Sequence, residues 1–194
     1  MKVSSYMHRD PVTVVADAPL SQVKRVMEEN GFGLLLIVDA DGGLKGFVTK
    51  GALKDVTDWT LPAEKVTYEA RFAVSPQDSL EKAALILLQN RLALLPVVDG
   101  GRLVGVITQG EILSALTRAL GIGLEGTRLT VRVRNDSDDL YKALAVLREH
   151  AVHLVSVAQG ERNETHRSMI LRVQGVPDKE KLRLDLEAAL TSKS

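Results

Sequence analysis

Thr108 and Glu111 are the two residues whose types and spacing are best suited to polar chemistry in this chain. In Thr108-Gln-Gly-Glu111 the hydroxyl and the carboxylate stand three residues apart, which is the spacing of a helix-capping box. A carboxylate can also accept charge-assisted hydrogen bonds from two neighbouring hydroxyls of a ligand. The spacing therefore leaves two roles open, a helix cap and a polar grip on a ligand.

Other candidates for catalysis or metal binding are weak. Cysteine is absent, which excludes disulfides, thiolate metal sites and cysteine nucleophiles. His150 and His153 have a spacing that a metal could use on a helix, but they are predicted to lie across a helix-to-strand junction. Residues 121–126 read G-x-G-x-x-G, yet they follow a helix and precede a strand, the reverse of a dinucleotide-binding turn. We assign no catalytic residue and no metal site, and expect a protein that is not an enzyme.

The elements that must position Thr108 and Glu111 occur twice in the sequence. Residues 14–39 are written again, sixty positions later, as residues 74–99. The turn that follows is one residue longer in the first copy, so Thr49 meets Thr108 at an offset of fifty-nine. Two copies of one unit predict a pseudo-twofold body with paired clefts between the copies, where small ligands usually bind.

Each copy is predicted to run strand, helix, strand, turn, strand, helix. The apolar runs at 34–38 and 94–98 are short and bounded by turn residues, as is typical of strands buried on both faces. Each run is expected to return through a hairpin, at 44–49 and at 103–108.

The helices predicted at 20–30 and 80–90 differ on their outer faces. The first carries Lys and Glu there, whereas the second carries Ala84, Leu85 and Leu88. A helix that is apolar on every side is buried on every side. We therefore expect these three residues to lie in a homodimer interface, with packing of one repeat on the other as the alternative.

The residues beyond the glycines at 121–126 follow a different pattern, and those glycines predict a flexible break. Alternation of polar and apolar residues predicts a half-buried strand at 128–133. The remaining residues are predicted to form a helix at 138–150, strands at 153–158 and 168–173 joined by a polar loop at 159–166, and a helix at 178–190. The predicted order of elements is therefore βαββα.

Length, charge and hydropathy bound the class of protein. A chain of 194 residues can hold one or two domains with their own cores. Lys plus Arg and Asp plus Glu each number 25, which removes the general attraction to nucleic acid. No twenty-residue apolar stretch or signal peptide is apparent. We expect a soluble cytoplasmic protein with no membrane or nucleic-acid partner.

The second copy closely resembles the CBS motif. It runs Leu95-Pro-Val-Val-Asp99, a glycine turn, Leu103-Val-Gly-Val-Ile-Thr108, and Glu111 three residues after the Thr. The first copy has Leu36 where the motif has Pro. Two such motifs form a Bateman module, which the resemblance places over residues 1–122, with motifs at about 1–58 and 64–122.

Residues 126–194 resemble an ACT domain, on the strand Arg128-Leu-Thr-Val-Arg-Val133 before a helix and on the order of elements. The combined order is similar to that of acetoin-utilisation-type CBS–ACT proteins. The resemblance implies an α/β (α+β) fold in which a Bateman module precedes a ferredoxin-like ACT domain. That domain would lack its last strand, because Thr191-Ser-Lys-Ser194 is too short to form one.

The resemblance also implies a ligand and its sites. Bateman modules bind adenosine-containing metabolites, so AMP, adenosine or S-adenosylmethionine is expected as a regulatory ligand, with no cofactor. In each cleft the Thr and acid of one repeat would hold the ribose, and strands of the other would hold the base. The first site would comprise Thr108, Glu111, Thr13, Val14, Gly33 and Leu34. The second, weaker site would comprise Thr49, Lys50, Phe72, Val74, Ala93, Leu94 and Pro96.

Several residues depart from the family pattern. Glu111 stands where the acid is usually Asp, and Ala52 leaves the first repeat with no acid, so the second site should hold ribose poorly. No His or Arg precedes the buried strands, which favours an adenosine-like ligand over ATP. In the tail, Asp138 stands where amino-acid-binding ACT domains have Gly, so we expect residues 136–138 to cap a helix instead.

Two functions remain open. One is a non-enzymatic sensor that binds an adenosyl metabolite, forms a homodimer and regulates a target enzyme, with the ACT-like domain for dimerisation or output. The other is a scaffolding protein whose ligand sites have decayed and which acts through oligomerisation or partner binding.

Overall fold

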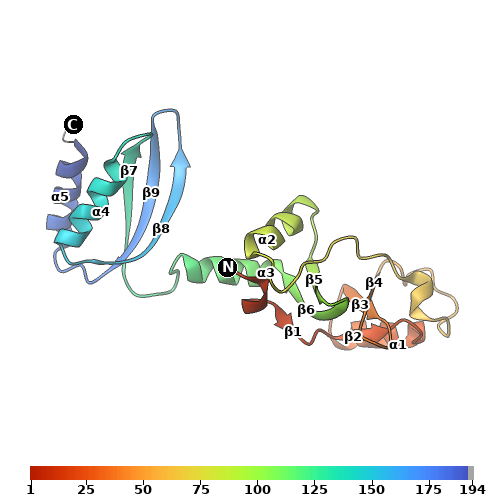
Figure 1. Cartoon of the computed structure of the whole chain (residues 1–194). Helices are drawn as coiled ribbons and strands as arrows, with labels where there is room; N and C mark the ends of the chain where they lie inside the picture. Colours follow the sequence, from red (N-terminus) through yellow and green to blue (C-terminus); the bar gives the residue numbers. More distant parts are fainter. Residues whose placement is uncertain (192–194) are drawn as a thin grey trace. The chain divides into compact units, whose positions relative to one another are not determined.

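The computed structural model describes residues 1–191 (Figure 1). The chain divides into two compact units, one after the other in the sequence. The first unit holds residues 1–113 and the second begins at Ser114, so the division falls inside helix α3 (Gln109–Ala119). Every helix among the described residues is too short or too polar to cross a membrane.

The first unit contains the predicted pair of repeats, each built around a small sheet. In the first repeat, β3 lies between β2, which is parallel to it, and β4, which is antiparallel. Its elements are β2 (Thr13–Val15), α1 (Leu20–Glu29), β3 (Leu34–Val38) and β4 (Leu44–Thr49). The second repeat has α2 (Leu80–Gln89), β5 (Leu94–Asp99) and β6 (Arg102–Thr108), and β1 (His8–Arg9) pairs with its β6. The duplicated helix–hairpin unit is confirmed, but the opening strand predicted for both repeats forms only in the first, and in the second it is reduced to a single bridge between Val74 and Val97.

One predicted element is missing from the first repeat. The sequence predicts a helix after each hairpin, and only the second repeat forms it, as α3; residues 51–55 form turns. The Thr49 hydroxyl accepts a hydrogen bond from the N–H of Ala52 at 3.2 Å. Ala52, however, has no carboxylate to bond the N–H of Thr49 in return. Half of the capping box is therefore absent after β4. The prediction of a helix after the hairpin of the first repeat is wrong.

The residues that precede each repeat are bound to the other repeat. The N-terminal segment lies on the second repeat, where the N–H of Val3 donates to the carbonyl of Asp78 at 2.9 Å. Its 3₁₀ turn η1 (Val3–Ser5) leads into β1, which pairs antiparallel with β6.

The segment between the repeats makes the equivalent contacts with the first repeat. Its 3₁₀ turn η2 (Ala63–Val66) begins with Ala63, whose N–H donates to the carbonyl of Ala18 at 2.8 Å. Further on, Tyr68 and Phe47 exchange two backbone hydrogen bonds of 2.9 Å each. We call residues 1–12 and 59–73 the crossing segments. Each crossing segment precedes one repeat and packs on the other, so the two segments interlock the repeats.

Gly46 is the point where a crossing segment comes closest to β4. A Cβ at Gly46 would lie 2.0 Å from the carbonyl oxygen of Tyr68, and the backbone φ is +152°. Only a residue without a side chain allows this approach.

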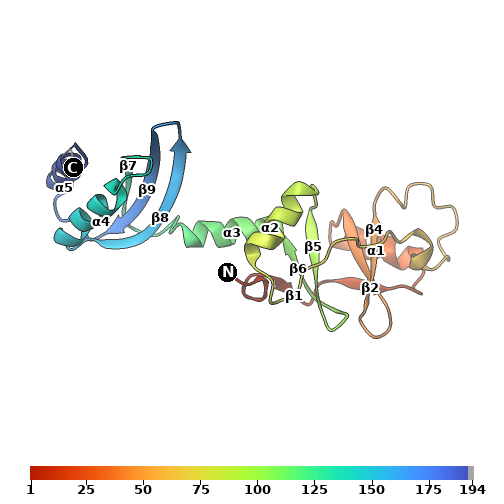
Figure 2. The same ribbon diagram turned by 45° about the horizontal axis from the view of Figure 1, so that its top comes forward.

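The second unit is a three-stranded antiparallel sheet with both helices on one face (Figures 1 and 2). Its elements are β7 (Thr127–Arg134), α4 (Asp139–Glu149), β8 (His153–Arg162), β9 (His166–Gln174) and α5 (Lys179–Thr191). The strand order is β7-β9-β8, and the predicted βαββα order is confirmed. The polar loop shrinks to residues 163–165, because β8 and β9 extend into the range predicted as loop.

The sheet has the ferredoxin-like ACT arrangement, and within residues 1–191 no fourth strand follows α5. Residues 192–194, which the sequence predicts to be too short for that strand, lie outside the described residues.

The glycine-rich segment that the sequence predicts to be a flexible break is bonded to the second unit. The Ser156 hydroxyl donates to the carbonyl of Leu120 at 2.9 Å. Arg172 Nη2 donates to the carbonyl of Leu124 at 2.9 Å, and Gln174 Nε2 to that of Glu125 at 2.7 Å. These bonds explain why the division between units falls within α3 and not at residues 121–126.

An ion pair between Arg134 and the buried carboxylate of Asp139 fixes the turn between β7 and α4. The carboxylate of Asp139, which is 2% exposed, accepts from Arg134 Nε at 2.9 Å, from Nη2 at 2.7 Å and from the backbone N–H at 3.0 Å. The hydrogen bonds from Arg134 hold the pKa of Asp139 well below its ordinary value, although burial acts in the other direction.

The cap predicted for residues 136–138 forms only in part. Asp138 occupies the N-cap position without making a side-chain cap bond, and it pairs with Lys142 at 3.2 Å. Only Ser137 accepts a bond from the helix, from the N–H of Asp139 at 3.3 Å.

We predict that Asp139→Asn destabilises the second unit by about 1–2 kcal/mol at neutral pH, because it removes a buried charge from three hydrogen bonds. We expect a loss of stability no larger than this because the Arg134 side chain is 44% exposed, so water weakens its interaction with Asp139. A depressed pKa stabilises the fold at pH values above the unfolded pKa, and this contribution is lost as the pH falls towards the folded pKa. The difference between wild type and variant should therefore shrink below pH about 4. Thermal unfolding followed by NMR of the full chain measures it, with Asp138→Asn as the control of small effect.

We also predict that Gly46→Ala lowers the melting temperature of the first unit, because the new methyl group would overlap the carbonyl of Tyr68. The matched control is Gly33→Ala, since a Cβ at Gly33 meets nothing within 4 Å. Calorimetry of the full chain compares the two. Equal melting temperatures for both variants would contradict the close approach of the crossing segment.

Candidate functional site

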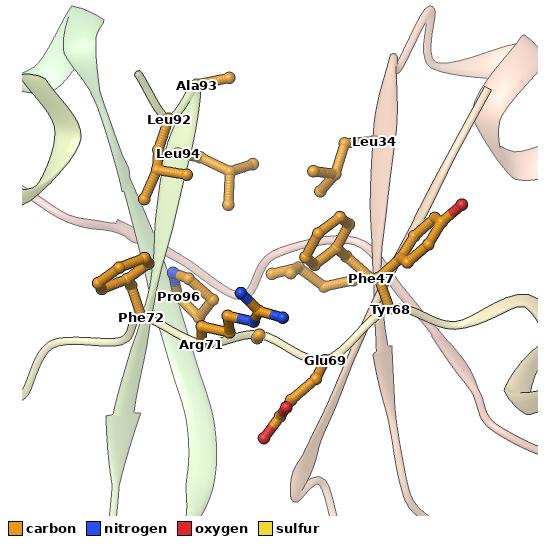
Figure 3. A pocket seen from close by; sticks show the side chains of 12 residues that line it. Leu34, Phe47, Tyr68, Glu69, Arg71, Phe72, Leu92, Ala93, Leu94 and Pro96 are labelled. Atoms are coloured by element: carbon orange, nitrogen blue, oxygen red, sulfur yellow. The ribbon is translucent and has the colours of Figure 1, made fainter. Parts of the chain in front are cut away.

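The candidate site in the first unit is a cleft of about 360 Å³ between the two repeats (Figure 3). Both sheets and the crossing segment between the repeats contribute to its walls. The lining residues are Leu34, Leu36, Phe47, Tyr68, Glu69, Ala70, Arg71, Phe72, Leu92, Ala93, Leu94 and Pro96. Two apolar walls thus face one another across a space of small-molecule size.

The walls come from corresponding positions of the two repeats. Leu34 begins β3 and Leu94 begins β5, so the sixty-residue repeat places them on opposite sides of the same space (Figure 3). Phe47 of β4 packs against Tyr68 of the crossing segment, with ring centroids 5.8 Å apart. Pro96 stands opposite the first repeat, where the corresponding residue is Leu36.

Arg71 is the cation of this cleft. Its guanidinium extends into the space between the two walls, whereas the Glu69 carboxylate points away from it (Figure 3). Among the described residues Arg71 forms no ion pair and no side-chain hydrogen bond. Sequence reasoning missed Arg71, because its position on the cleft follows only from the path of the crossing segment.

Thr108 and Glu111 form the predicted capping box at the start of α3. Glu111 Oε2 accepts from the backbone N–H of Thr108 at 2.9 Å and also from its hydroxyl. The hydroxyl in turn accepts from the N–H of Gly110 at 3.1 Å. Burial acts to raise the pKa of Glu111, but the bonds from Thr108 outweigh it and hold the pKa below its ordinary value. The carboxylate is therefore ionised at neutral pH.

The capping box does not line the cleft, but it lies beside it. Thr108 is the register partner of Leu94, which does line the cleft. Gln109 Nε2 donates to the carbonyl of Leu92, another lining residue, at 3.2 Å.

The other members of the first predicted site are dispersed, apart from Leu34. Thr13 lies in β2 and lines a separate hollow of about 280 Å³ with Asp10, Pro11, Val38, Gly42, Leu103 and Val104. Val14 is buried in the core of the first repeat. Gly33 is exposed, and its carbonyl accepts from the N–H of Lys50 at 3.1 Å.

The second predicted site is largely brought together. Phe72, Ala93, Leu94 and Pro96 all line the cleft, together with Leu34 from the first set. The remaining three do not line it: Val74 is buried and pairs with Val97, Thr49 ends β4, and Lys50 is exposed. The structure therefore assembles an apolar cleft from four residues of the second predicted site and one residue, Leu34, of the first.

The outer face of α2 is not covered by the rest of the first unit. Leu85 is 55% exposed and Leu88 is 68% exposed, while Ala84 is partly buried. The first repeat does not cover them, so packing of one repeat on the other does not explain this apolar face.

Comparison with known proteins agrees with this architecture. The family model described as the CBS domain matches residues 3–57 and 68–118, which together exceed half of the chain. The chain belongs to the CBS domain family. Both matched ranges end beyond the hairpin of their repeat, as the duplicated fold requires.

Solved structures of similar proteins extend the comparison. The chain is 28% identical to a protein of Vibrio cholerae described as an acetoin utilization protein (AcuB), with a TM-score of 0.56 over 63% of this chain and 94% of that one. It is also 28% identical to TM0892 of Thermotoga maritima, a CBS domain pair/ACT domain protein, with a TM-score of 0.56 over 62% and 99%. CBSX2, solved in complex with AMP, shares the fold at 22% identity, with a TM-score of 0.53 over 59% and 95%.

Curated relatives are longer than this chain. Protein MJ1404 of Methanocaldococcus jannaschii is 27% identical over 83% of the chain, which spans 40% of that protein. The chain thus spans less than half the length of this relative.

Proposed function

We propose that the first unit is a regulatory module, without catalytic activity, that binds an adenosine-containing metabolite in the cleft between its two CBS repeats. The observation that carries the proposal is the 360 Å³ cleft itself, with an apolar wall from each repeat and one free arginine. A ligand in this cleft would contact both repeats and the crossing segment at once.

The apolar walls suit a purine ring. Leu34 and Phe47 on one side and Leu94 and Pro96 on the other offer a flat slot with few polar side chains. Burial of an aromatic ring between such walls is favourable by about 25 cal/mol per Å² of apolar surface. The polar edge of the base would bond backbone groups of the strands.

Arg71 changes the ligand expected from sequence alone. The sequence offers no cation before the buried strands, which favours an uncharged nucleoside. The Arg71 guanidinium in the cleft can instead form charge-assisted, bidentate hydrogen bonds with a phosphate. One arginine suits a nucleoside monophosphate such as AMP better than adenosine alone.

Glu111 and Thr108 are the proposed ribose contacts. Glu111 is ionised and lies next to the Leu92–Leu94 edge of the cleft. In the free protein its carboxylate caps α3, so ribose hydroxyls would compete with or join the bonds from Thr108. Because Ala52 stands at the equivalent place in the first repeat, no second carboxylate grip is expected there.

Helix α3 links the proposed ligand contacts to the second unit. Its first turn holds Glu111 and is capped by Thr108, and its last residues belong to the second unit along the chain. A ligand that strengthens or weakens the first turn would bias α3, with a coupling free energy of about 1–3 kcal/mol in typical allosteric proteins. The ACT-like unit is then the proposed site of dimerisation or output to a target enzyme.

We predict that AMP raises the melting temperature of the full chain more than adenosine does. A ligand at a hundred times its Kd adds about 2.7 kcal/mol of stability. Arg71→Gln should weaken AMP binding by about tenfold and leave adenosine binding unchanged, since it removes only the phosphate contact. Calorimetric titration of both ligands measures this, with Lys50→Gln as the control because Lys50 is exposed and outside the cleft lining.

The same titrations decide between sensing and scaffolding. Glu111→Ala should abolish the shift by adenosine compounds in a protein that still unfolds cooperatively. A panel of AMP, ADP, ATP, adenosine, S-adenosylmethionine and amino acids that leaves the melting temperature unchanged would favour the scaffolding alternative.

We further propose that α2 forms a homodimer contact through Ala84, Leu85 and Leu88. Two exposed leucines one helical turn apart form an apolar stripe on a face that carries no charge at these positions. Leu85→Glu with Leu88→Glu should shift the full chain from dimer to monomer in light scattering. The matched control is Gln89→Glu, which adds a charge at an exposed position of the same helix. A dimer that persists in the double variant would place the contact elsewhere.

A further inference from the structure

Strand β7 leaves one edge of the sheet in the second unit open. The strand order is β7-β9-β8, so among the described residues β7 pairs on one side only, with β9 (Figures 1 and 2). An edge strand carries a row of backbone N–H and C=O groups that can pair with another chain. The open edge of β7 is therefore a surface on which a further strand could be added.

The hydrogen bonds at the end of β7 show which of its backbone groups face the open edge. The N–H of Asn135 donates to the carbonyl of Thr165, on the side of β9, at 2.9 Å. The N–H of Arg134 donates instead to the Asp139 carboxylate at 3.0 Å. Because backbone groups alternate in direction along a strand, every second residue before Arg134 also faces the open edge. These residues are Arg128, Thr130 and Arg132.

The outward-facing groups of these three residues have no partner in the part of the chain that the structure describes. No backbone hydrogen bond from another element reaches them, and all three residues are exposed. Three N–H donors and three C=O acceptors are therefore available to an added strand.

A groove of about 630 Å³ lies along this edge, with α5 as its other wall. From β7 it is lined by Leu129, Thr130, Val131 and Arg132. These four consecutive residues belong to both faces of the sheet, so the groove reaches the backbone at the edge of the strand. From α5 it is lined by Lys179, Arg183, Leu186, Glu187, Leu190 and Thr191, most of which share one face of the helix.

The two sides of β7 would offer different chemistry to an added strand. Leu129 and Val131 pack with the core under the helices. Side chains alternate along a strand, so Arg128, Thr130 and Arg132 lie on the helix-free face. Within residues 1–191 neither Arg128 nor Arg132 forms an ion pair. An added strand would therefore meet apolar groups on one face and two unpaired guanidinium groups on the other.

A second copy of β7 is a poor occupant of this edge. In an antiparallel pairing about Thr130, the centre of the open stretch, Arg128 of each copy would lie opposite Arg132 of the other. Like charges in directly opposed cross-strand positions destabilise a sheet. The charges of the edge thus disfavour self-pairing and favour a strand with acidic side chains at these positions.

We propose that the open edge of β7 binds an extended segment of a partner protein in which acidic and apolar residues alternate. In such β-strand addition the main-chain hydrogen bonds give affinity and alternate side chains give specificity. The acidic side chains would pair with Arg128 and Arg132, and the apolar ones would enter the groove beside α5. The proposal rests on the output role proposed above for the second unit, and it does not require a nucleotide in the cleft between the repeats.

A fluorescently labelled heptapeptide in which Glu and Val alternate is the probe for this site. Fluorescence anisotropy with the full chain, measured without nucleotide, should show saturable binding that weakens as salt is added. A peptide of the same composition with Glu and Val in two separate blocks should bind at least about tenfold more weakly, because it cannot place the two kinds of side chain on opposite faces of a strand. Equal binding of the two peptides would contradict the proposal.

Amide hydrogen exchange of the unmodified chain, followed by NMR, locates the bonds. The N–H groups of Arg128, Thr130 and Arg132 should exchange more slowly when the alternating peptide is bound. Those of Leu129 and Val131 already face β9 and should change little. Bound peptide without slower exchange at the three outward-facing positions would overturn the proposal.

Thr130→Pro removes one outward-facing N–H without removing a bond to β9, because proline is tolerated at edge positions whose N–H points away from the sheet. It should weaken peptide binding by at least about tenfold, whereas the matched control Thr130→Val should leave it unchanged. Equal binding by both variants would contradict strand addition. Light scattering in which Thr130→Pro converts a dimer to a monomer would show that a second copy occupies the edge, and would also overturn the proposal.

Arg128→Gln with Arg132→Gln tests the charge and keeps the proposal falsifiable if the proline variant fails to fold. The double variant should weaken binding of the alternating peptide by about fivefold and reduce its salt dependence. Arg148→Gln is the control, since Arg148 is exposed in the same unit but outside the groove, and it should leave the affinity unchanged. Equal affinity of the double variant and wild type would contradict an acidic partner. A chain that binds the peptide but not AMP would overturn the nucleotide proposal alone.

Discussion

The reciprocal exchange of crossing segments is the constraint on which the first unit depends. Each repeat is completed by residues that precede the other, with Val3 and Ala63 fully buried at equivalent places. Neither repeat can therefore close its own core alone. The exchange also sends residues 68–72 along the seam between the sheets, where they bring Arg71 and Phe72 to the cleft. The packing that holds the repeats together thus also builds the candidate site.

The sequence predicted most of the fold because the repeat and the hydropathy periods are local patterns. The duplicated hairpins and the βαββα tail were confirmed, since a five-residue apolar run such as 34–38 or a pattern such as 128–133 is compatible with few structures. The absence of a helix after Thr49 could also have been predicted, because Ala52 stands where the capping box needs an acid. We used that difference only to predict weak ribose binding. The path of the crossing segments was not predictable, because their pairing joins residues about twenty to a hundred positions apart.

The sequence predicted several of the residues that line the cleft, but it did not predict which of them lie together. Leu34, Phe72, Ala93, Leu94 and Pro96 do line one cleft, although Leu34 was predicted to belong to the other site. Arg71 and the pair Arg134–Asp139 were missed for the same reason. A charged residue in a polar stretch resembles a solvated one until its neighbours in space are known. Arg128 and Arg132 of β7 belong to this class too, since only the hydrogen bonds of β7 show that both face its open edge.

Methyl NMR of the full chain with AMP tests the central claim most directly. A nucleotide in the cleft must contact both repeats, so intermolecular NOEs should join the adenine protons to the methyl groups of both Leu34 and Leu94. The account predicts NOEs to both leucines at saturating AMP. Binding of AMP with adenine NOEs only to residues outside the cleft, or to one repeat alone, would contradict it.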